Sequence, residues 1–350
     1  MNDLISALEG RTTYTVLERG DVTLVVNPEI GAKAIGLSAD GSAGRNLLWF
    51  NPQAAVDSFW QGEPGWNLGG LRSWIAPEAS FYLDSANNWF VPSGMDPGNY
   101  KETHRSKDRI EYTNDFAVTD PEGRDYPLRL VRSLTVLDLP PDLARAPARV
   151  KFAGITQEHS LTNLGTGVLG GDLKRVGLWS LLQINPPGTM IIPIAGAPED
   201  AYRNYFNPIP SERMTELPGV LTVKIDGEYR CKLGIRPEAA RGVLGYLWRP
   251  KRGDLALYVF RFDVDPKGVY LDHPWEQPYD YGDAVQIYND DGAMGGFAEM
   301  ECHGPSEVLE PGQTESHSVE LLVFSGREED LISIGTRLLR LPLERLEFYF

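Results

Sequence analysis

The sequence predicts an all-β protein of the sandwich or barrel class, and three observations support this. Short segments of alternating apolar and polar residues run through most of the chain. Gly, Pro, Asn and Asp separate these segments, as they do in antiparallel sheets with one buried face. Only one segment, near the C-terminus, has strong helical periodicity, so a regular alternation of strands and helices is not indicated.

Individual strands are predicted from the alternation and from the turns between them. The clearest alternating segments are 13–17, 22–26, 32–37, 220–225, 228–235, 243–248 and 255–263. Asp226 and Gly227 separate two of these segments and form a typical two-residue hairpin turn, whereas the longer turn 249–254 separates the last two. We therefore expect two hairpins in this half of the chain.

The predicted helix covers about residues 327–342, after the last strand. Its apolar residues recur at helical spacing: Leu331, Ile334, Leu338 and Leu341. Acidic residues precede them and arginines follow, as the helix dipole favours. We expect this short C-terminal helix to cover an edge or an end of a sheet.

Between residues 51 and 101 the alternation fades into a segment rich in Gly, Pro and Trp. Four tryptophans lie in it: Trp60, Trp66, Trp74 and Trp89. Because so aromatic a segment is a poor solvated linker, we interpret it as an ordered loop excursion over a binding face. No convincing linker divides the chain, so we expect a single domain over residues 1–350, with its core at about 12–325.

Composition narrows the classes of function. The 350 residues carry a net charge of −16, which disfavours nucleic acid as a partner. The N-terminus has no signal-like apolar segment, and no long apolar run suggests a membrane span, so we expect a cytoplasmic protein. Cys231 and Cys302 are predicted to be buried free thiols. Neither a metal-binding cluster nor a nucleotide-binding motif is evident, so no metal and no cofactor are predicted; the oligomeric state stays open.

The most informative stretch is 282–324, because alternation there places ionisable side chains on one face of a strand. Residues of one parity are Phe297, Glu299, Glu301 and His303, and those of the other are Ala298, Met300 and Cys302. The small apolar set can pack inward, which leaves two carboxyl groups and an imidazole facing a cleft or solvent. This face is the predicted centre of any chemistry.

Three parts of the chain resemble the galactose mutarotase (aldose 1-epimerase)-like superfamily, nearest to an uncharacterised bacterial branch. They are 69–78 (GGLRSWIAPE), 161–164 (LTNL) with 179–181 (WSL), and 282–324. The resemblance spans roughly residues 12–324. It implies a β-supersandwich of two large antiparallel sheets whose concave face binds carbohydrate.

The resemblance also implies roles for individual residues. Glu301 is similar to the glutamate that removes the proton of the anomeric hydroxyl in mutarotases, where a histidine on a central strand protonates the ring oxygen. The chain departs from this pattern, because Trp179 stands where that acid is expected. Arg72 is similar to a sugar-contacting residue, and Trp74 shares its strand face; Glu78 completes the motif.

Structural interpretations of the same residues stay open. Arg72 either binds sugar hydroxyls or a uronate while Trp74 stacks on a pyranose ring, or it forms an internal ion pair with an acid such as Glu78 while Trp74 fills core. Glu299 and Glu301 either divide acid and base roles or form ion pairs with neighbouring cations. His303 is a candidate proton donor or a surface residue beside a turn, and His104 is a candidate that reaches the cleft from a loop.

We therefore expect a carbohydrate-active protein that binds a sugar or an oligosaccharide in a concave cleft. The leading hypothesis is an aldose 1-epimerase-like activity with Glu301 as the general base, assisted by Glu299 and His303. Cleavage of glycosidic bonds by a carboxylate pair is one alternative. The other is a sugar-binding or sugar-sensing protein that has lost the central acid.

Overall fold

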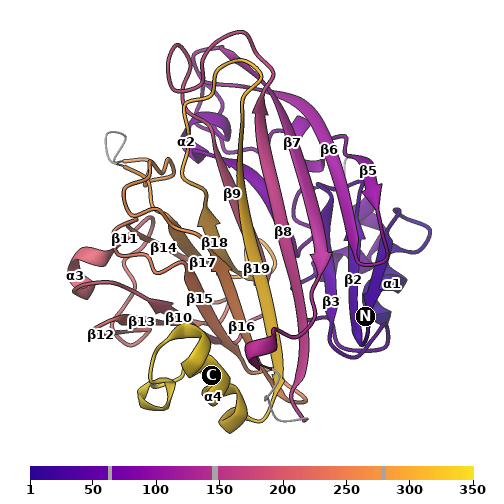
Figure 1. Cartoon of the computed structure of the whole chain (residues 1–350), viewed down its shortest axis with the longest axis vertical. Helices are drawn as coiled ribbons and strands as arrows, with labels where there is room; N and C mark the ends of the chain where they lie inside the picture. Colours follow the sequence, from indigo (N-terminus) through magenta and orange to yellow (C-terminus); the bar gives the residue numbers. More distant parts are fainter. Residues whose placement is uncertain (62–64, 144–148, 277–280) are drawn as a thin grey trace.

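A computed structural model describes residues 1–61, 65–143, 149–276 and 281–350 of the chain. Two large antiparallel sheets pack face to face and form the central body of the molecule (Figure 1). One sheet has nine strands and the other has ten. The expected all-β supersandwich with a short C-terminal helix is confirmed.

The nine-stranded sheet brings together strands that are far apart in the sequence. In pairing order its strands are β1 (Thr15–Arg19), β2 (Val22–Asn27), β3 (Lys33–Ser38), β4 (Leu71–Ala76), β9 (Gly177–Ile184), β18 (Ala298–His303), β17 (Val285–Asn289), β14 (Cys231–Ile235) and β11 (Tyr202–Asn204). The centre of this sheet, β4-β9-β18, contains a segment from each of the three parts of the chain that carry the family resemblance, whereas residues 161–163 of the LTNL segment end β8 (Lys151–Asn163) in the other sheet.

The ten-stranded sheet contains the longest strands. In pairing order they are β12 (Met214–Leu217), β13 (Val220–Ile225), β10 (Gly188–Pro193), β15 (Val243–Trp248), β16 (Leu255–Phe262), β19 (Thr314–Gly326), β8 (Lys151–Asn163), β7 (Asp125–Val136), β6 (Arg109–Thr119) and β5 (Lys101–Arg105). Several of these strands lie side by side across the front of Figure 1.

The main core lies between the sheets. Leu71, Leu182 and Met300 reach it from the nine-stranded sheet, and Ile155 and Leu321 reach it from the ten-stranded sheet. Both cysteines are buried in this region as free thiols, as expected. Because side chains alternate along a strand, the residues between these core positions on β4, β9 and β18 face away from the second sheet.

Helices are short and few among the described residues. The α-helices are α1 (Asn2–Leu8), α2 (Glu78–Phe81), α3 (Pro198–Ala201) and α4 (Glu328–Leu339), and the shorter helical turns are η1 (Pro52–Ala55), η2 (Asp57–Trp60), η3 (Gly94–Gly98), η4 (Pro141–Leu143) and η5 (Leu343–Arg345). Nowhere in the described ranges does a helix combine the length and apolar character needed to cross a bilayer.

The C-terminal helix forms where the periodicity predicts it, but it does not cover a sheet edge. Leu331 and Ile334 of α4 pack with Leu257 and Val259 of β16, a central strand. The helix therefore buries its apolar side against the outer face of the ten-stranded sheet, near the lower end of the molecule in Figure 1.

One of the two expected hairpins is wrong. The strands β15 and β16 pair across the longer turn, as predicted. However, β13 pairs with β10 and β12, whereas β14 pairs with β11 and β17 in the other sheet. The Asp226-Gly227 turn therefore carries the chain from one sheet to the other. Asp226 forms ion pairs with Arg213 and Lys224 there, and the pairing of β13 and β14 with strands of different sheets overrides the local hairpin signal.

The tryptophan-rich segment is more regular than a loop excursion, because it contains β4 and α2. The helix α1 was not predicted from the sequence; its Leu4 and Leu8 pack in one hydrophobic cluster with Ile35 and Leu68.

Candidate functional site

A small cavity opens on the face of the nine-stranded sheet that points away from the ten-stranded sheet. Its volume is about 210 Å³. Glu299 and Glu301 of β18 line it, whereas the intervening Met300 packs in the core between the sheets. The alternation predicted for this strand, with Glu299 and Glu301 on one face and Met300 on the other, is therefore the one found in the structure.

Two glycines shape the approach to the cavity. Gly69 and Gly70, which begin the GGLRSWIAPE motif, have φ angles of 114° and 79°. A Cβ atom on Gly70 would overlap the carbonyl oxygen of Ala34 on the neighbouring strand. Only glycine fits this conformation and this close approach, so the pair lets the chain turn tightly into β4 and aim Arg72 and Trp74 at the cavity.

Strand register then places the polar residues opposite one another. Arg72 of β4 pairs with Leu181 of β9, and Leu181 pairs with Glu301 of β18. One residue pair further along, Glu299 lies opposite Tyr288 of β17, which lies opposite Lys232 of β14. Because neighbouring strands are only about 4.8 Å apart, these side chains converge in one place.

Two buried ion pairs cross this arrangement diagonally. Arg72 Nη2 lies 2.8 Å from Glu299 Oε1, and Lys232 Nζ lies 3.3 Å from Glu301 Oε2. Trp179 also donates its indole N–H to Glu301 Oε2, at 3.1 Å. The sequence left open whether these carboxyl groups pair with cations, and both of them do.

Some polar atoms of the same residues have no partner. Glu301 Oε1 is buried and accepts no hydrogen bond from any residue that the structure describes. The same holds for Arg72 Nε and Nη1, which donate to no described residue. Because unpaired buried polar groups are costly, atoms of this kind that line a cavity are candidates to bind the polar groups of a ligand.

A wall of tryptophans runs from the floor of the cavity to its mouth. Ring centroids are 5.8 Å apart between Trp179 and Trp74, 5.4 Å between Trp74 and Trp66, and 5.6 Å between Trp66 and Trp89. Trp179 is 2% exposed, whereas Trp89 is 38% exposed. The Arg72 guanidinium lies 4.2 Å from the ring centroid of Trp74, a cation–π contact that fixes both groups.

Trp74 is also held from behind by a buried ion pair. Its indole N–H donates to Asp96 Oδ2 at 2.9 Å, and Lys33 Nζ lies 2.8 Å from the same oxygen. Lys33 donates in addition to the backbone carbonyl of Trp66. The two central tryptophans of the wall are therefore fixed by polar contacts as well as by packing.

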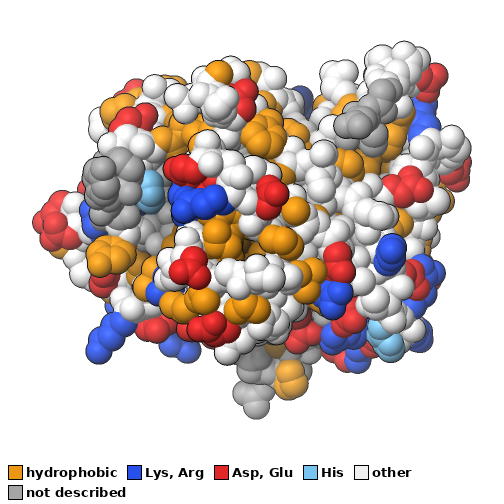
Figure 2. Space-filling model, turned by 90° about the horizontal axis from the view of Figure 1, so that it is seen from above, with side chains coloured by type: hydrophobic (Ala, Val, Ile, Leu, Met, Phe, Trp, Pro, Cys, Tyr) orange, Lys and Arg blue, Asp and Glu red, His pale blue; other side chains and the backbone are white. Residues whose placement is uncertain are grey.

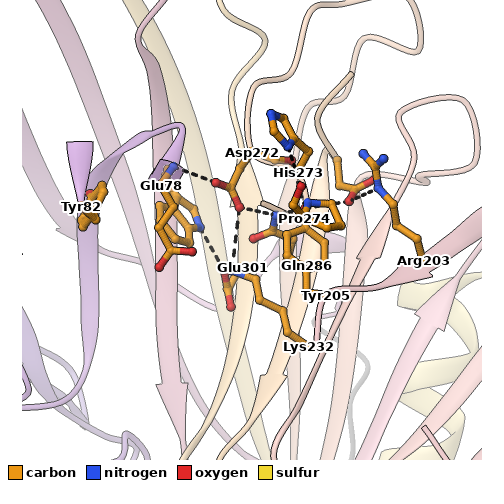
Figure 3. Close-up of polar contacts among 12 residues, drawn as sticks. Glu78, Tyr82, Arg203, Tyr205, Lys232, Asp272, His273, Pro274, Gln286 and Glu301 are labelled. Atoms are coloured by element: carbon orange, nitrogen blue, oxygen red, sulfur yellow. Dashed lines mark hydrogen bonds and ion pairs between the residues drawn. The ribbon is translucent and has the colours of Figure 1, made fainter. Parts of the chain in front are cut away.

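Asp272, in the segment between β16 and β17, connects residues on the other side of the cavity from the tryptophan wall. Its Oδ1 accepts the backbone N–H of Glu78 at 2.8 Å, and its Oδ2 accepts the side-chain amide of Gln286 at 2.8 Å. Lys232 Nζ lies 3.9 Å from Oδ2. Figure 3 shows Glu78, Asp272, Lys232 and Glu301 converging above the strands.

The charges shift the pKa values of the groups at the site. Burial raises the pKa of Glu301 to about 7, the nearby Glu299 and Asp272 carboxylates add to the rise, and Lys232 opposes it. Burial alone would lower the pKa of Lys232, but the carboxylates of Glu301 and Asp272 outweigh it and raise the pKa. Glu301 is therefore a carboxyl group that can exchange a proton near neutral pH, beside a permanent cation.

Burial also raises the pKa of Glu78, and the charge of Asp272 contributes in the same direction. Lys232 and the indole N–H of Trp89 oppose the rise. Trp89 Nε1 lies 2.8 Å from Glu78 Oε1. Two carboxyl groups with raised pKa values, Glu78 and Glu301, therefore line one cavity.

Six of the eight predicted site residues meet in this cavity: Arg72, Trp74, Glu78, Trp179, Glu299 and Glu301. His303 does not line it, because its ring stacks on Trp179 at a centroid distance of 5.1 Å. Burial lowers the pKa of His303 to about 3, so the ring is neutral. His104 lies on the exposed edge strand β5 of the other sheet and is not brought to the cavity, contrary to our expectation.

Sequence reasoning missed several lining residues, of which Lys232 is the most important. Lys232 alternates with the apolar Cys231 and Leu233, so its face could have been deduced. A lysine on a half-apolar strand is usually solvent-exposed, however, and only the structure shows that β14 lies beside β17. Asp272 follows the last predicted strand of its region and had no pattern to single it out.

The surface seen from above the sandwich carries both signs of charge. Figure 2 shows acidic and basic side chains interspersed with hydrophobic ones on this end of the molecule. The net charge of −16 is therefore not reflected in one uniformly acidic surface here.

Comparisons with known proteins agree with the fold. The model of DUF6786, a family of unknown function, matches residues 2–350. No protein of the curated set matches the chain. The structure is similar to that of a galactose mutarotase-like protein from Lactobacillus casei ATCC 334, with 10% identity, a TM-score of 0.54, and coverage of 89% of this chain and 100% of that one.

It is also similar to a candidate aldose 1-epimerase from Escherichia coli K12, with 15% identity, a TM-score of 0.52, and coverage of 89% of this chain and 98% of that one. A galactose mutarotase related enzyme from Lactobacillus acidophilus gives 9% identity and a TM-score of 0.51, over 90% of this chain and 99% of that one. These similarities confirm the fold suggested by the three sequence segments.

Proposed function

Because the chain belongs to DUF6786 and has a galactose mutarotase-like fold, we propose that it binds a sugar in the tryptophan-lined cavity and catalyses an aldose 1-epimerase-like exchange of anomers. The observation that carries this proposal is the buried Glu301 carboxyl, which lines the cavity, has one oxygen without a partner, and has a pKa near neutral. That combination suits a general base.

The walls of the cavity support sugar binding. Pyranose rings present C–H groups that pack on indole faces, and their hydroxyl groups need hydrogen-bond partners at the rim of each face. The tryptophan wall offers the indole faces, and the unpaired polar atoms of Arg72 and Glu301 offer hydrogen-bond partners for the hydroxyl groups. A volume of about 210 Å³ suits a ligand of monosaccharide size. The exposed Trp89 and Trp275 at the mouth leave space for a longer glycan to continue outward.

The chemistry assigned to Glu301 is removal of the proton from the anomeric hydroxyl. The Lys232 ammonium, 3.3 Å from Oε2, favours the ionised carboxylate. Burial and the charge of Glu299 raise the pKa of Glu301, so that the carboxylate can accept a proton. The partnerless Oε1 is the oxygen available to the sugar. Glu299 acts through Arg72, since their ion pair fixes the guanidinium against Trp74.

The test is proton NMR of the purified protein with aldoses, uronic acids and short oligosaccharides. Accelerated interconversion of anomers without new reducing ends is the expected result. The matched variant Glu301→Gln keeps the shape of the side chain but has no basicity, so it should retain binding and lose at least 100-fold in exchange rate, roughly the contribution of a general base. Unchanged exchange in that variant would remove Glu301 from the role of base.

Sugar binding without catalysis is the second candidate. It is favoured by Trp179, which occupies the central strand where the resemblance places an acidic histidine. In that case the same spectra show ligand binding and no acceleration. New reducing ends would instead favour glycosidic cleavage, for which Glu299 is poorly placed because Arg72 already engages it.

A further inference from the structure

We propose that Glu78 is the proton donor to the ring oxygen of the sugar and so takes the place of the missing histidine. The inference rests on the proposed function and assigns the second half of its chemistry. It starts from the composition of the cavity lining, in which only a few side chains can release a proton.

Elimination among the described residues that line the cavity leaves Glu78. The ionisable ones are Arg72, Glu78, Arg230, Lys232, Tyr288, Glu299 and Glu301. Arginines do not lose their protons in proteins. Glu299 Oε1 is engaged by Arg72 Nη2 at 2.8 Å, and Glu301 is the base. Lys232 is held as an ammonium by Glu301 and Asp272.

Two aromatic residues near the site, Tyr288 and His303, are also unsuitable as proton donors. Burial raises the pKa of Tyr288 far above its ordinary value, and its hydroxyl is engaged by Arg230 and Asp290. His303 is neutral, and Trp179 lies stacked against its ring. Neither group supplies a proton to the cavity near neutral pH.

The position of Glu78 fits the role. Asp272 Oδ1 fixes its backbone N–H, while Trp89 Nε1 fixes its Oε1 at 2.8 Å. Asp272 Oδ2 lies 3.9 Å from Lys232, whose Nζ lies 3.3 Å from Glu301. Glu78 and Glu301 therefore approach the cavity from two ends of one chain of contacts, which runs through Asp272 and Lys232 (Figure 3).

The protonation states also suit the division of labour. Burial and the negative charge of Asp272 raise the pKa of Glu78, which favours its protonated form. Lys232 Nζ lies 3.3 Å from Glu301 Oε2, and its charge favours the ionised form of that carboxyl group. Two carboxyl groups whose surroundings differ in this way can serve as acid and base in one site.

The proposed step balances in protons and electrons. Glu301 takes the proton of the anomeric hydroxyl as the C1–O5 bond breaks, and Glu78 gives its proton to O5, which leaves an open-chain aldehyde. Rotation about C1–C2 exposes the other face of the carbonyl group. O5 then attacks C1, its proton returns to Glu78, and the proton on Glu301 moves to the new anomeric oxygen.

The experiment compares wild type with Glu78→Gln and Glu78→Asp in anomeric exchange followed by NMR over pH. We expect Glu78→Gln to lower kcat by about 100-fold to 10,000-fold with little change in KM, and Glu78→Asp to restore part of the loss. Wild-type exchange should fall as the pH rises through the pKa of Glu78, and this alkaline limb should be absent in Glu78→Gln. Full kcat in Glu78→Gln would overturn the proposal.

Two further measurements separate this role from a structural one and from failure of the proposed function. Trp89→Phe keeps an aromatic ring but removes one of the two indole N–H groups, those of Trp89 and Trp275, that lower the Glu78 pKa, so the alkaline limb should move to higher pH. Side-chain ¹³C NMR titration of Glu78 needs no substrate. If no sugar exchanges, the epimerase function fails by itself; a Glu78 carboxyl that titrates at the ordinary value overturns the proton-donor role in any case.

Discussion

Two buried arginines differ in how many of their hydrogen-bond donors are used within the fold. Arg132, on β7, is fully buried between the sheets, and each of its side-chain nitrogens donates to a carbonyl oxygen. Its acceptors are Gln157 Oε1 and the backbone carbonyls of Gly31, Ala32 and Leu71. Nothing in this arrangement is left for another molecule.

Arg72 is equally hidden, at 2% exposure, but it is incompletely used. Its Nη2 contacts Glu299, whereas Nε and Nη1 have no partner among the described residues. The two arginines meet at β4, because Arg132 donates to the carbonyl of Leu71, the residue just before Arg72. We call the contacts of Arg132 with β4, in the core, its saturated side, and the contacts of Arg72, in the cavity, its unsaturated side.

The largest expected effect comes from breaking both sides at once. In Gly70→Ala the new Cβ would overlap the carbonyl oxygen of Ala34, in a backbone conformation with φ of 79° that alanine disfavours. The start of β4 would have to move, which disturbs the contacts of both arginines. We expect a loss of more than about 4 kcal/mol in the free energy of unfolding, measured by urea denaturation. Gly123→Ala, at a φ of 80° with nothing within 4 Å, is the control for backbone strain alone.

Breaking only the saturated side should have the next largest effect. Arg132→Met fills similar space but leaves the Leu71, Gly31 and Ala32 carbonyls without their donor in the core. We expect about 3–5 kcal/mol of destabilisation in urea denaturation, since each buried acceptor left unpaired costs about 1–3 kcal/mol. A loss below about 1 kcal/mol would mean that water satisfies these carbonyls, and the contrast with Arg72 would then disappear.

The sequence predicts features of this protein that depend on local burial, but not those that depend on contacts between distant strands. Alternation identified the strands around Val22 and Val243 and the face of β18, because each depends on local burial. It failed at Asp226, where a local hairpin signal competes with the pairing of β13 to β10 in one sheet and of β14 to β17 in the other. Strand order is decided by such distant contacts, which a single sequence does not contain.

Within the site, the same limit applies residue by residue. Arg72, Trp74 and Glu301 were predicted together because motif and parity both pointed to them. Lys232 and Asp272 were not, because their importance comes from the packing of β14 beside β17 and from the path of the chain after β16. Neither contact leaves a periodic pattern.

The cavity side should also respond to pH, with an effect of on the order of 1–3 kcal/mol. The folded protein raises the pKa of Glu301 to about 7, above its value in the unfolded chain, so the folded state binds a proton at higher pH. This group therefore weakens the fold above pH 7, and the penalty disappears as the pH falls towards the ordinary glutamate value. Urea denaturation from pH 8 to pH 5 should show wild type gaining stability relative to Glu301→Gln. A constant difference would mean that Lys232 keeps the carboxylate ionised throughout.

The smallest change tests the unsaturated side alone. Arg72→Lys retains a cation for Glu299, so we expect less than about 1 kcal/mol of destabilisation, but it removes the idle Nε and Nη1 donors and the planar contact with Trp74. Sugar affinity measured by calorimetry should fall by about 10-fold, close to 1.4 kcal/mol, for loss of donors to a ligand. Arg230→Lys, at the exposed side of the same cavity, is the matched control and should change affinity less. If Arg72→Lys lost stability as Arg132→Met does and bound sugar unchanged, both arginines would belong to the scaffold, and the idle donors of Arg72 would have no ligand to meet.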